Sequence, residues 1–483
     1  MSDSTIVTGI TLIYLSVVLW VGIRARGQSG SSLEGYVAGG RHVSVFILFF
    51  IIGAEIFSAF TFLGAPGWAY QHGAVALYIF AFISLATIPI WVLGPRAAEL
   101  GRARGYLTQG DMIADHYRSR PLGILAGAIG VLALVPYLAI QITGAGLLFQ
   151  AATDGFIPFW LGAFLAFVVV AIYVFFSGLK GIGWTNLLQG IMMVSIAWFL
   201  GLAVTHRLFG GVGEMFTQIK LQMPEYLTMP GVTGMTWGGV STAILVSAFG
   251  SGMWPHVFTR FYSADSARSL RQVSVLYPLY SLLLIPLLLI GLAGMLIFAG
   301  SPLARPDTVL LEVVLKVANF SPWVKGLMLS GALAAAMSSG ANQAHTVAVI
   351  LTRDILGSNL MRNASEAQAV SVTRWSVLGL SLVAYAIALF NPVSLVVLLL
   401  GAYGVIVQLM PMVLGALFFP SLNRAGVTLG VIVGSLTFLV CQFLIDSPLG
   451  WHPGLWGLGM NLVGVYIGQK WLPDTAAQSR AIG

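Results

Sequence analysis

Charged residues and cysteine are both scarce in this chain. Only 8% of its 483 residues are charged and 58% are hydrophobic, whereas about a quarter of the residues in a typical soluble domain are charged. The single cysteine, Cys441, lies inside an apolar stretch, which excludes a disulfide framework and a cysteine-based metal site. The seven histidines lack the spacing of metal ligands, and no P-loop for ATP occurs. The composition argues against a soluble enzyme and predicts an all-α polytopic membrane protein.

Long apolar runs fill most of the chain. Thirteen stretches are long enough to cross the roughly 30 Å hydrocarbon core of a bilayer as helices. They cover residues 5–23, 44–70, 73–95, 121–150, 156–177, 185–206, 239–261, 272–299, 323–350, 371–391, 393–418, 425–445 and 452–469. We therefore predict thirteen transmembrane helices. Basic residues follow the first stretch instead of preceding it, so we expect a retained helix and not a cleaved signal peptide.

Lysine and arginine are distributed unevenly between the two sets of alternate loops. One set holds only Arg207, Lys220, Arg305, Lys316 and Lys325, and the remaining 18 of the 23 basic residues lie in the other set and in the C-terminal tail. The positive-inside rule then places the N-terminus outside and the C-terminus in the cytoplasm. We expect a multi-pass protein of a cell membrane, such as a bacterial inner membrane. The net charge of +7 is thus a topology signal, and no nucleic-acid partner is expected.

Two of the apolar stretches are interrupted near their middle. The stretch 44–70 contains Gly53, Glu55 and Pro66, and the stretch 239–261 contains the sequence GSGMWPH at 250–256. Backbone groups freed at such a break need partners in protein or in a water-lined cavity, because lipid offers none. Paired breaks in the two halves of a membrane protein are typical of a transporter's binding site.

The two interrupted stretches are the second and the seventh, which indicates an internal repeat of five helices. We predict four regions: 1–43 with the first helix and a cytoplasmic loop, 44–206 as the first repeat, 239–418 as the second, inverted repeat, and 419–483 with two further helices and a tail. This division follows from the corresponding breaks and from the alternating charge.

The ninth stretch has a polar face that suits a cation. Residues 330–343 are mostly small, so that another helix can approach closely, and Ala335, Ser338 and Ser339 share one face at i, i+3 and i+4. A hard cation such as Na⁺ needs several oxygen ligands. The missing ligands are expected from carbonyl groups at the break in 44–70. Alternatively, the two serines bond back to their own helix.

A few ionisable residues lie within the apolar stretches. Glu55 is an acid in a predicted core helix, and a carboxylate at that depth is a functional hypothesis. It has three possible roles: to attract the cation, to accept a proton, or to brace the break. His256 and Arg260 share a face at i and i+4, with Arg260 favoured to extend toward the interface. His345 is favoured as a packing residue.

Aromatic and polar residues near the breaks are candidates to line a solute pocket. Each of them alone is more often a core or interfacial residue, and they carry the prediction only as a set. The candidates are Thr61, Tyr137, Gln141, Trp254, His256, Tyr403 and Gln408.

Several motifs together resemble the sodium:solute symporter family, whose members carry proline, sugars, pantothenate and monocarboxylates. The stretch 35–41 (GYVAGGR) is similar to the sequence before the family's broken helix, and 58–67 (SAFTFLGAPG) to its first core helix. The pattern Ala335-x-x-Ser338-Ser339 is similar to the family's sodium site. The resemblance covers nearly the whole chain.

This resemblance implies a LeuT-like fold with an inverted repeat and a bound sodium ion. Sodium would be held by the carbonyl oxygens of Ala54, Phe57 and Ala335 and by the hydroxyls of Ser338 and Ser339. The proline-type branch is similar to this chain except for an acid at the position of Ile56. Glu55 lies one position earlier and does not inherit that acid's role from the resemblance.

The expected function is sodium-coupled import of a small organic solute by alternating access, without enzymatic activity. Segments 62–70, 135–141 and 253–258 resemble the monocarboxylate permease and pantothenate branches, so a carboxylate solute is favoured. Other possibilities are a sodium/proline-type amino-acid symporter, or a proton-coupled or uncoupled permease in which Glu55 or His256 titrates. A membrane-embedded sensor, an enzyme or a channel is less expected, because the chain lacks the motifs that each would need.

Overall fold

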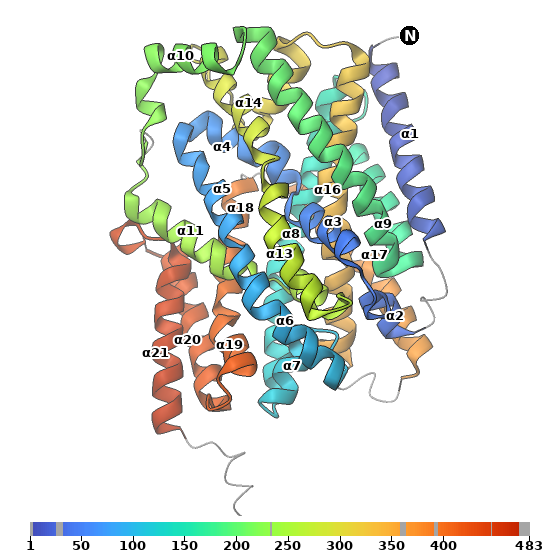
Figure 1. Ribbon diagram of the computed structural model, residues 1–483, viewed down its shortest axis with the longest axis vertical. Coiled ribbons are helices and arrows are strands. Elements are labelled where there is room, and N and C mark those ends of the chain that lie inside the picture. Colours follow the sequence, from blue (N-terminus) through green and yellow to red (C-terminus); the bar gives the residue numbers. More distant parts are fainter. Residues whose placement is uncertain are drawn as a thin grey trace, which may run out of the picture.

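The computed structural model describes residues 3–25, 32–231, 234–357, 364–390, 395–445 and 447–472. Within these residues the chain is a bundle of helices, and its strand-like pairing is limited to an isolated bridge between Val43 and Ala264. Helices occupy all thirteen of the predicted apolar stretches (Figure 1). The long apolar runs therefore form the elements that hydropathy predicts.

The helices of the N-terminal part follow the predicted order. They are α1 (Asp3–Arg24), α2 (Leu33–Ala38), α3 (Val45–Ile56), α4 (Ala65–His72), α5 (Leu77–Leu85), α6 (Thr87–Arg104), α7 (Gln109–His116), α8 (Arg120–Ala152), α9 (Phe159–Phe209) and α10 (Val212–Gln222).

The helices of the C-terminal part begin after the loop that contains α10. They are α11 (Trp237–Ser251), α12 (Pro255–Ser263), α13 (Ala267–Ser281), α14 (Leu284–Ile297), α15 (Val309–Leu311), α16 (Pro322–Ile350), α17 (Glu366–Phe390), α18 (Leu395–Ile406), α19 (Met410–Phe418), α20 (Arg424–Phe443) and α21 (Pro453–Trp471).

Both predicted breaks are present. α3 ends at Ile56, and Phe57 is extended (φ −86°, ψ 96°) before the chain resumes as a π-helical turn over Phe60–Gly64 and then as α4. α11 ends at Ser251, and α12 begins at Pro255 after the non-helical Trp254. Among the described residues, eight helical stretches are long and apolar enough to cross a membrane. Two of these, Phe60–Arg104 and Phe159–Phe209, each run through two predicted stretches, and the number thirteen stays a prediction.

Three more of the predicted stretches bend at a proline. Proline cannot donate a hydrogen bond to the carbonyl four residues earlier, and this missing bond interrupts a helix. Pro89, Pro286 and Pro411 each lie a few residues after the point where a helix is interrupted. The stretch 73–95 divides into α5 and α6 after Leu85, and 272–299 divides into α13 and α14 at Leu282. The stretch 393–418 has a 3₁₀ turn at Val407–Leu409 between α18 and α19. These three bends are additional to the two predicted breaks.

The predicted loop between the fifth and sixth stretches is a sharp turn within α9. Gly178 has a φ of 54° there, and the chain is helical again directly after it. A Cβ atom at Gly178 would lie 2.5 Å from the carbonyl oxygen of Tyr36. The positive φ and this close approach both favour glycine, and they allow a loop shorter than the predicted gap at 178–184.

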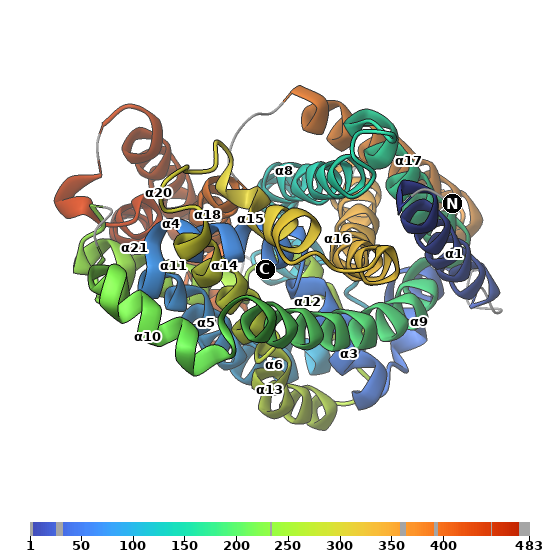
Figure 2. The same cartoon turned by 90° about the horizontal axis from the view of Figure 1, so that it is seen from above.

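α16 lies in the interior of the bundle. Seen from above, it is surrounded by α1, α8, α9 and α17 (Figure 2), and its residues from Met328 to Ile350 are buried. Small side chains make this packing possible, because a Cβ at Gly331 or Gly340 would collide with Ile196 or Phe167. The helix with the predicted serine pair is thus held from several sides.

The C-terminal helices α20 and α21 pack backbone against backbone. A Cβ atom at Gly464 would lie 2.8 Å from the Cα of Gly430, and one at Gly468 would lie 2.6 Å from the Cα of Gly426. These glycines are four residues apart on each helix, the spacing of small-residue interfaces between membrane helices.

Replacing Gly464 with leucine is expected to force α20 and α21 apart. Overpacking of this kind costs about 1–3 kcal/mol, which should appear as a lower thermal unfolding temperature of the purified protein in detergent. Gly459→Leu is the matched control, because a Cβ at Gly459 would have no neighbour within 4 Å. Equal unfolding temperatures for the two variants would contradict the close packing of the two helices.

Candidate functional site

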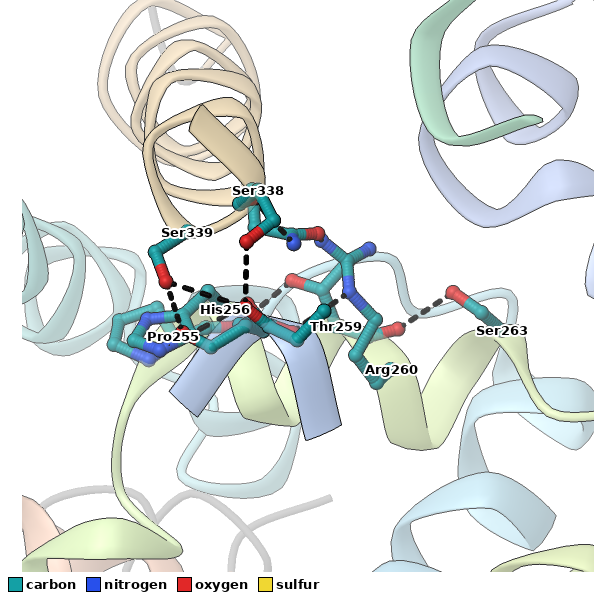
Figure 3. Close-up of polar contacts among 10 residues, drawn as sticks. Pro255, His256, Thr259, Arg260, Ser263, Ser338 and Ser339 are labelled. Carbon is teal, nitrogen blue, oxygen red and sulfur yellow. Dashed lines mark hydrogen bonds and ion pairs between the residues drawn. The ribbon is translucent and has the colours of Figure 1, made fainter. Parts of the chain in front are cut away.

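The break in α3 lies directly against the two serines of α16. The Ser338 hydroxyl donates to the carbonyl oxygen of Ala54 at 2.8 Å, and the Ser339 hydroxyl lies 3.3 Å from the same oxygen. Ser339 also donates to the carbonyl of Glu55 at 2.6 Å. Figure 3 shows both serine side chains pointing from α16 to the end of the broken helix. Two hydroxyls and two carbonyls from different helices therefore converge at one point.

The predicted cation ligands are largely brought together. The carbonyl of Ala335 lies 3.1 Å from the Ser338 hydroxyl, so four of the five predicted residues are linked by hydrogen bonds. The fifth, Phe57, is the residue at which the chain leaves α3. The alternative in which the serines bond back to their own helix applies to Ser338 only in part, because its shorter bond crosses to Ala54. The Glu55 carbonyl is an oxygen that the sequence did not point to.

Glu55 is braced by a buried ion pair. Its Oε2 atom lies 3.3 Å from Nε of Arg260, and both side chains are 0% exposed. Arg260 also donates from Nη2 to Oδ1 of Asn342 at 2.6 Å, and Nδ2 of Asn342 donates to the carbonyl of Ser338 at 3.0 Å. The network connects α3, α12 and α16 directly beside the serines (Figure 3).

The expectation that Arg260 extends toward the membrane interface is wrong. α12 has nine residues, all of them buried, so that the long side chain reaches the carboxylate at the break instead of water. Of the three possible roles of Glu55, this contact favours bracing, since the carboxylate already has a cationic partner. A buried pair of this kind is held only if its hydrogen bonds are well satisfied.

His256 lies on the other side of the same carboxylate. Its Nε2 atom is 3.8 Å from Oε1 of Glu55, which is longer than a hydrogen bond. Within the described part of the chain, Oε1 of Glu55, Nη1 of Arg260 and Nδ1 of His256 have no hydrogen-bond partner. Buried polar atoms normally bond to protein, water or an ion, so this side of the site has unused binding capacity.

Polar side chains satisfy the amides that the break in α3 sets free. Thr61 accepts from the Ser58 amide at 3.1 Å, the Ser58 hydroxyl from the Phe60 amide at 3.2 Å, and Oε1 of Gln141 from the Ala59 amide at 2.9 Å. Thr61 and Gln141, both predicted as solute ligands, thus hold the conformation of the break. Gln141 comes from α8 and ties that helix to α3.

Four of the predicted pocket residues form one aromatic cluster. The Trp254 ring lies 5.1 Å from Tyr137, 5.3 Å from His256 and 5.4 Å from Tyr403, measured between centroids. These residues come from α8, α18 and the start of α12, and all four are buried. Ring separations of this size are typical of favourable aromatic pairs. The cluster lies beside Glu55 through His256.

The remaining pocket candidate, Gln408, lies elsewhere, and so does His345. Gln408 donates to the carbonyls of Gly404 and Gly454 and accepts from Asn461, which places it between the 3₁₀ turn after α18 and α21. Nε2 of His345 lies 3.2 Å from the carbonyl of Tyr36, and their rings are 5.3 Å apart. His345 thus packs against Tyr36, and its Nδ1 atom has no hydrogen-bond partner among the described residues.

The donor atoms at the serine site are neutral oxygens, which suit a hard cation such as Na⁺. In the described residues, no group of three or more histidine, cysteine or acidic side chains is arranged to hold a metal ion. The set of two hydroxyls and neighbouring carbonyls at a helix break thus fits a monovalent cation better than zinc or iron.

Comparisons with known proteins show that the chain is similar to transporters. The family model described as the sodium:solute symporter family matches residues 36–434. A Bacillus subtilis protein named uncharacterized symporter YhjB is 31% identical over 88% of this chain and 87% of its own length. A monocarboxylate transport permease protein of Rhizobium johnstonii is 26% identical over 92% and 88% of the two chains. A sodium/proline symporter of Staphylococcus aureus is 28% identical over 89% and 84%.

The fold also matches that of solved transporters. The structure of a Na⁺-coupled sialic acid symporter superimposes with a TM-score of 0.82 at 17% identity, and the match covers 97% of this chain and 98% of that one. At this level of identity the likeness supports the fold alone.

Proposed function

The chain belongs to the sodium:solute symporter family, and from this premise we propose that it imports a small organic solute together with sodium. The observation that carries the proposal is the convergence of the Ser338 and Ser339 hydroxyls on the Ala54 and Glu55 carbonyls, at 2.6–3.3 Å. A sodium ion there would be shared by α3 and α16, and the carbonyls of Phe57 and Ala335 complete its proposed ligands.

Sodium at this position stabilises one arrangement of the two helices. Each serine hydroxyl turns its lone pairs to the ion instead of donating to a carbonyl, so that α3 and α16 are held by the cation. Coupling requires that sodium and solute favour the same conformation, and the linkage between them is reciprocal, typically about 1–3 kcal/mol. The outward-open state is the one that we assign to both ligands.

We propose that the solute binds at the aromatic cluster of Tyr137, Trp254, His256 and Tyr403 and carries a carboxylate. The N-terminus of α12 lies within this cluster, and helix N-termini favour anions through free amides and the helix dipole. The monocarboxylate permease and the proline symporter among the relatives are both named for solutes with a carboxylate. A monocarboxylate or pantothenate is the first choice, and proline is the second.

The same proposal includes the topology. Thirteen spanning helices, an N-terminus outside and a cytoplasmic C-terminus agree with the distribution of arginine and lysine. The regions 44–206 and 239–418 form two inverted repeats of the LeuT type, each with a broken first helix at α3/α4 and α11/α12. Rocking of these repeats exposes the site to one side of the membrane and then to the other.

The test is uptake of labelled pyruvate, lactate, acetate, pantothenate and proline into proteoliposomes with the purified protein. We expect an inward sodium gradient to stimulate uptake of at least one carboxylate severalfold, compared with choline in place of sodium and with protein-free liposomes. Uptake of proline alone would keep the coupling and contradict the preference for a monocarboxylate. Uptake that ignores sodium and rises as the external pH falls would contradict sodium coupling.

A further inference from the structure

α16 has further buried polar residues beyond the serine pair. At helical spacing, Ser339, Gln343 and Thr346 share one face, which continues through the apolar Ile350 to Asp354 in the π-helical turn Leu351–Leu356. Both amide atoms of Gln343 and the Thr346 hydroxyl are buried and have no hydrogen-bond partner among the described residues. Unpartnered polar atoms in a row are what a water-filled or ion-conducting route requires.

This face ends at two neighbouring cavities. The smaller, of about 10 Å³, is on the order of one water molecule in size and is lined by Pro255 and Thr259 of α12 and by Ile350 and Asp354. The larger has about 420 Å³ and is lined by Asp111, Asp354 and Glu366, among others. Asp354 and Gly110 line both cavities, so that the Asp354 carboxyl stands between them.

The larger cavity lies on the predicted cytoplasmic side of the molecule. Its walls include α7, which lies at the lower end of the molecule in Figure 1, opposite α10. The smaller cavity reaches α12 at Pro255 and Thr259, which directly precede His256 and Arg260, the two residues that contact Glu55. The smaller cavity thus lies next to the residues that contact Glu55, and the larger cavity lies at the cytoplasmic loops.

Asp354 has a free oxygen in this position. It is only 8% exposed, its Oδ1 accepts from the Thr108 hydroxyl at 2.5 Å, and its Oδ2 has no partner within the described ranges. A Cβ at Gly110 would be 2.5 Å from Oδ2, so the carboxyl lies against the first turn of α7. Gln109 lines the smaller cavity together with Asp354, and its Nε2 atom also has no hydrogen-bond partner among the described residues.

The other charged groups of the larger cavity are already engaged. Nε of Arg353 lies 3.1 Å from both carboxylate oxygens of Asp111, Arg120 donates to the carbonyl of Gly357, and Glu366 accepts from the Leu33 amide. Burial and the neighbouring Asp111 charge raise the pKa of Asp354 well above its usual range. A cation beside Oδ2 would favour the ionised form and offset both effects.

We propose that Asp354 is a second, transient sodium site, which receives the ion from the serine site and releases it to the cytoplasm. This inference rests on the proposed sodium coupling. The ligands of this site are Oδ2 of Asp354 and water in the two cavities. On its way from the serines the ion would pass the polar side chains of Gln343 and Thr346. A single carboxylate with water binds sodium weakly, as an exit site must, because conduction requires binding that is easy to leave.

The test is an infrared difference spectrum of the full-length protein in lipid, with sodium minus choline and no solute. In the wild type we expect a change in a carboxylate band on addition of sodium. Asp354→Asn, which keeps an acceptor for Thr108, should lose that change, and Asp354→Glu should retain it at a shifted frequency. Asp115→Asn is the matched control: Asp115 is a cytoplasmic-side carboxylate bonded to Tyr106 and Arg104, and its loss should leave the change intact.

The Ser338→Ala/Ser339→Ala variant separates this inference from the proposed function. If the Asp354 band change persists in this variant, sodium itself binds at Asp354, and the change is not an indirect effect of sodium at the serines. If the change disappears, Asp354 only responds to sodium at the serines, and the inference is overturned. An unchanged sodium spectrum in Asp354→Asn overturns it as well. Failure of sodium-stimulated uptake in the wild type would instead reject the proposed function.

Discussion

Replacing Arg260 with methionine is expected to cause the largest loss of stability of any single change at the site. Methionine fills much of the arginine's volume but leaves Glu55 without its cationic partner, 0% exposed, and Asn342 without its donor. Breaking a buried ion pair from one side costs about 3–5 kcal/mol, because the remaining charge is uncompensated. We expect a strongly lowered thermal unfolding temperature and a small monodisperse fraction on size exclusion in detergent.

Two further variants show whether the effect comes from the pair. In Glu55→Gln/Arg260→Met both charges are absent, so much of the stability should return, as replacement of a whole buried pair is often neutral. Arg104→Met breaks the pair with Asp115, whose side chains are 63% and 48% exposed, and exposed pairs are worth about 0–1 kcal/mol. If Arg260→Met were as stable as Arg104→Met, the buried pair would not brace the break.

Local properties of the sequence predicted the positions of the helices and of the two central breaks. Helix positions followed from hydropathy, and both breaks followed from glycine and proline in polar surroundings, because these are local properties. The bends at Pro89, Pro286 and Pro411 carried a similar local signal, but Pro136 carries it too and lies within the continuous helix α8, so proline alone does not predict a bend.

Contacts between side chains on helices that are far apart in the chain could not be predicted in the same way. The i, i+4 spacing of His256 and Arg260 shows that they share a face but not that the face meets Glu55, which is 205 residues away in the chain. Asn342 could have been found, because it lies four residues after Ser338 on the same polar face. Gln408 could not be assigned, since an amide in an apolar helix looks the same whether it lines a pocket or bonds to a neighbouring helix.

Removing both serine hydroxyls is expected to have the largest effect on transport. In Ser338→Ala/Ser339→Ala the site loses the two side-chain oxygens that converge on Ala54 and Glu55, while the carbonyls remain. We expect the sodium concentration for half-maximal uptake to rise at least tenfold, which corresponds to about 1.4 kcal/mol, or sodium stimulation to disappear. The measurement is uptake at varied external sodium in proteoliposomes, with the solute that the wild type transports.

The serines also connect two helices, so a structural defect must be separated from lost sodium binding. Ser330→Ala is the matched control, because Ser330 lies on the same helix, is equally buried, and bonds only within the helix, to the carbonyl of Gly326 at 2.9 Å. Sodium should raise the unfolding temperature of the wild type and of Ser330→Ala, but not that of the double variant. If the double variant lost maximal uptake rate with unchanged sodium dependence, the hydroxyls would serve packing, and sodium would bind elsewhere.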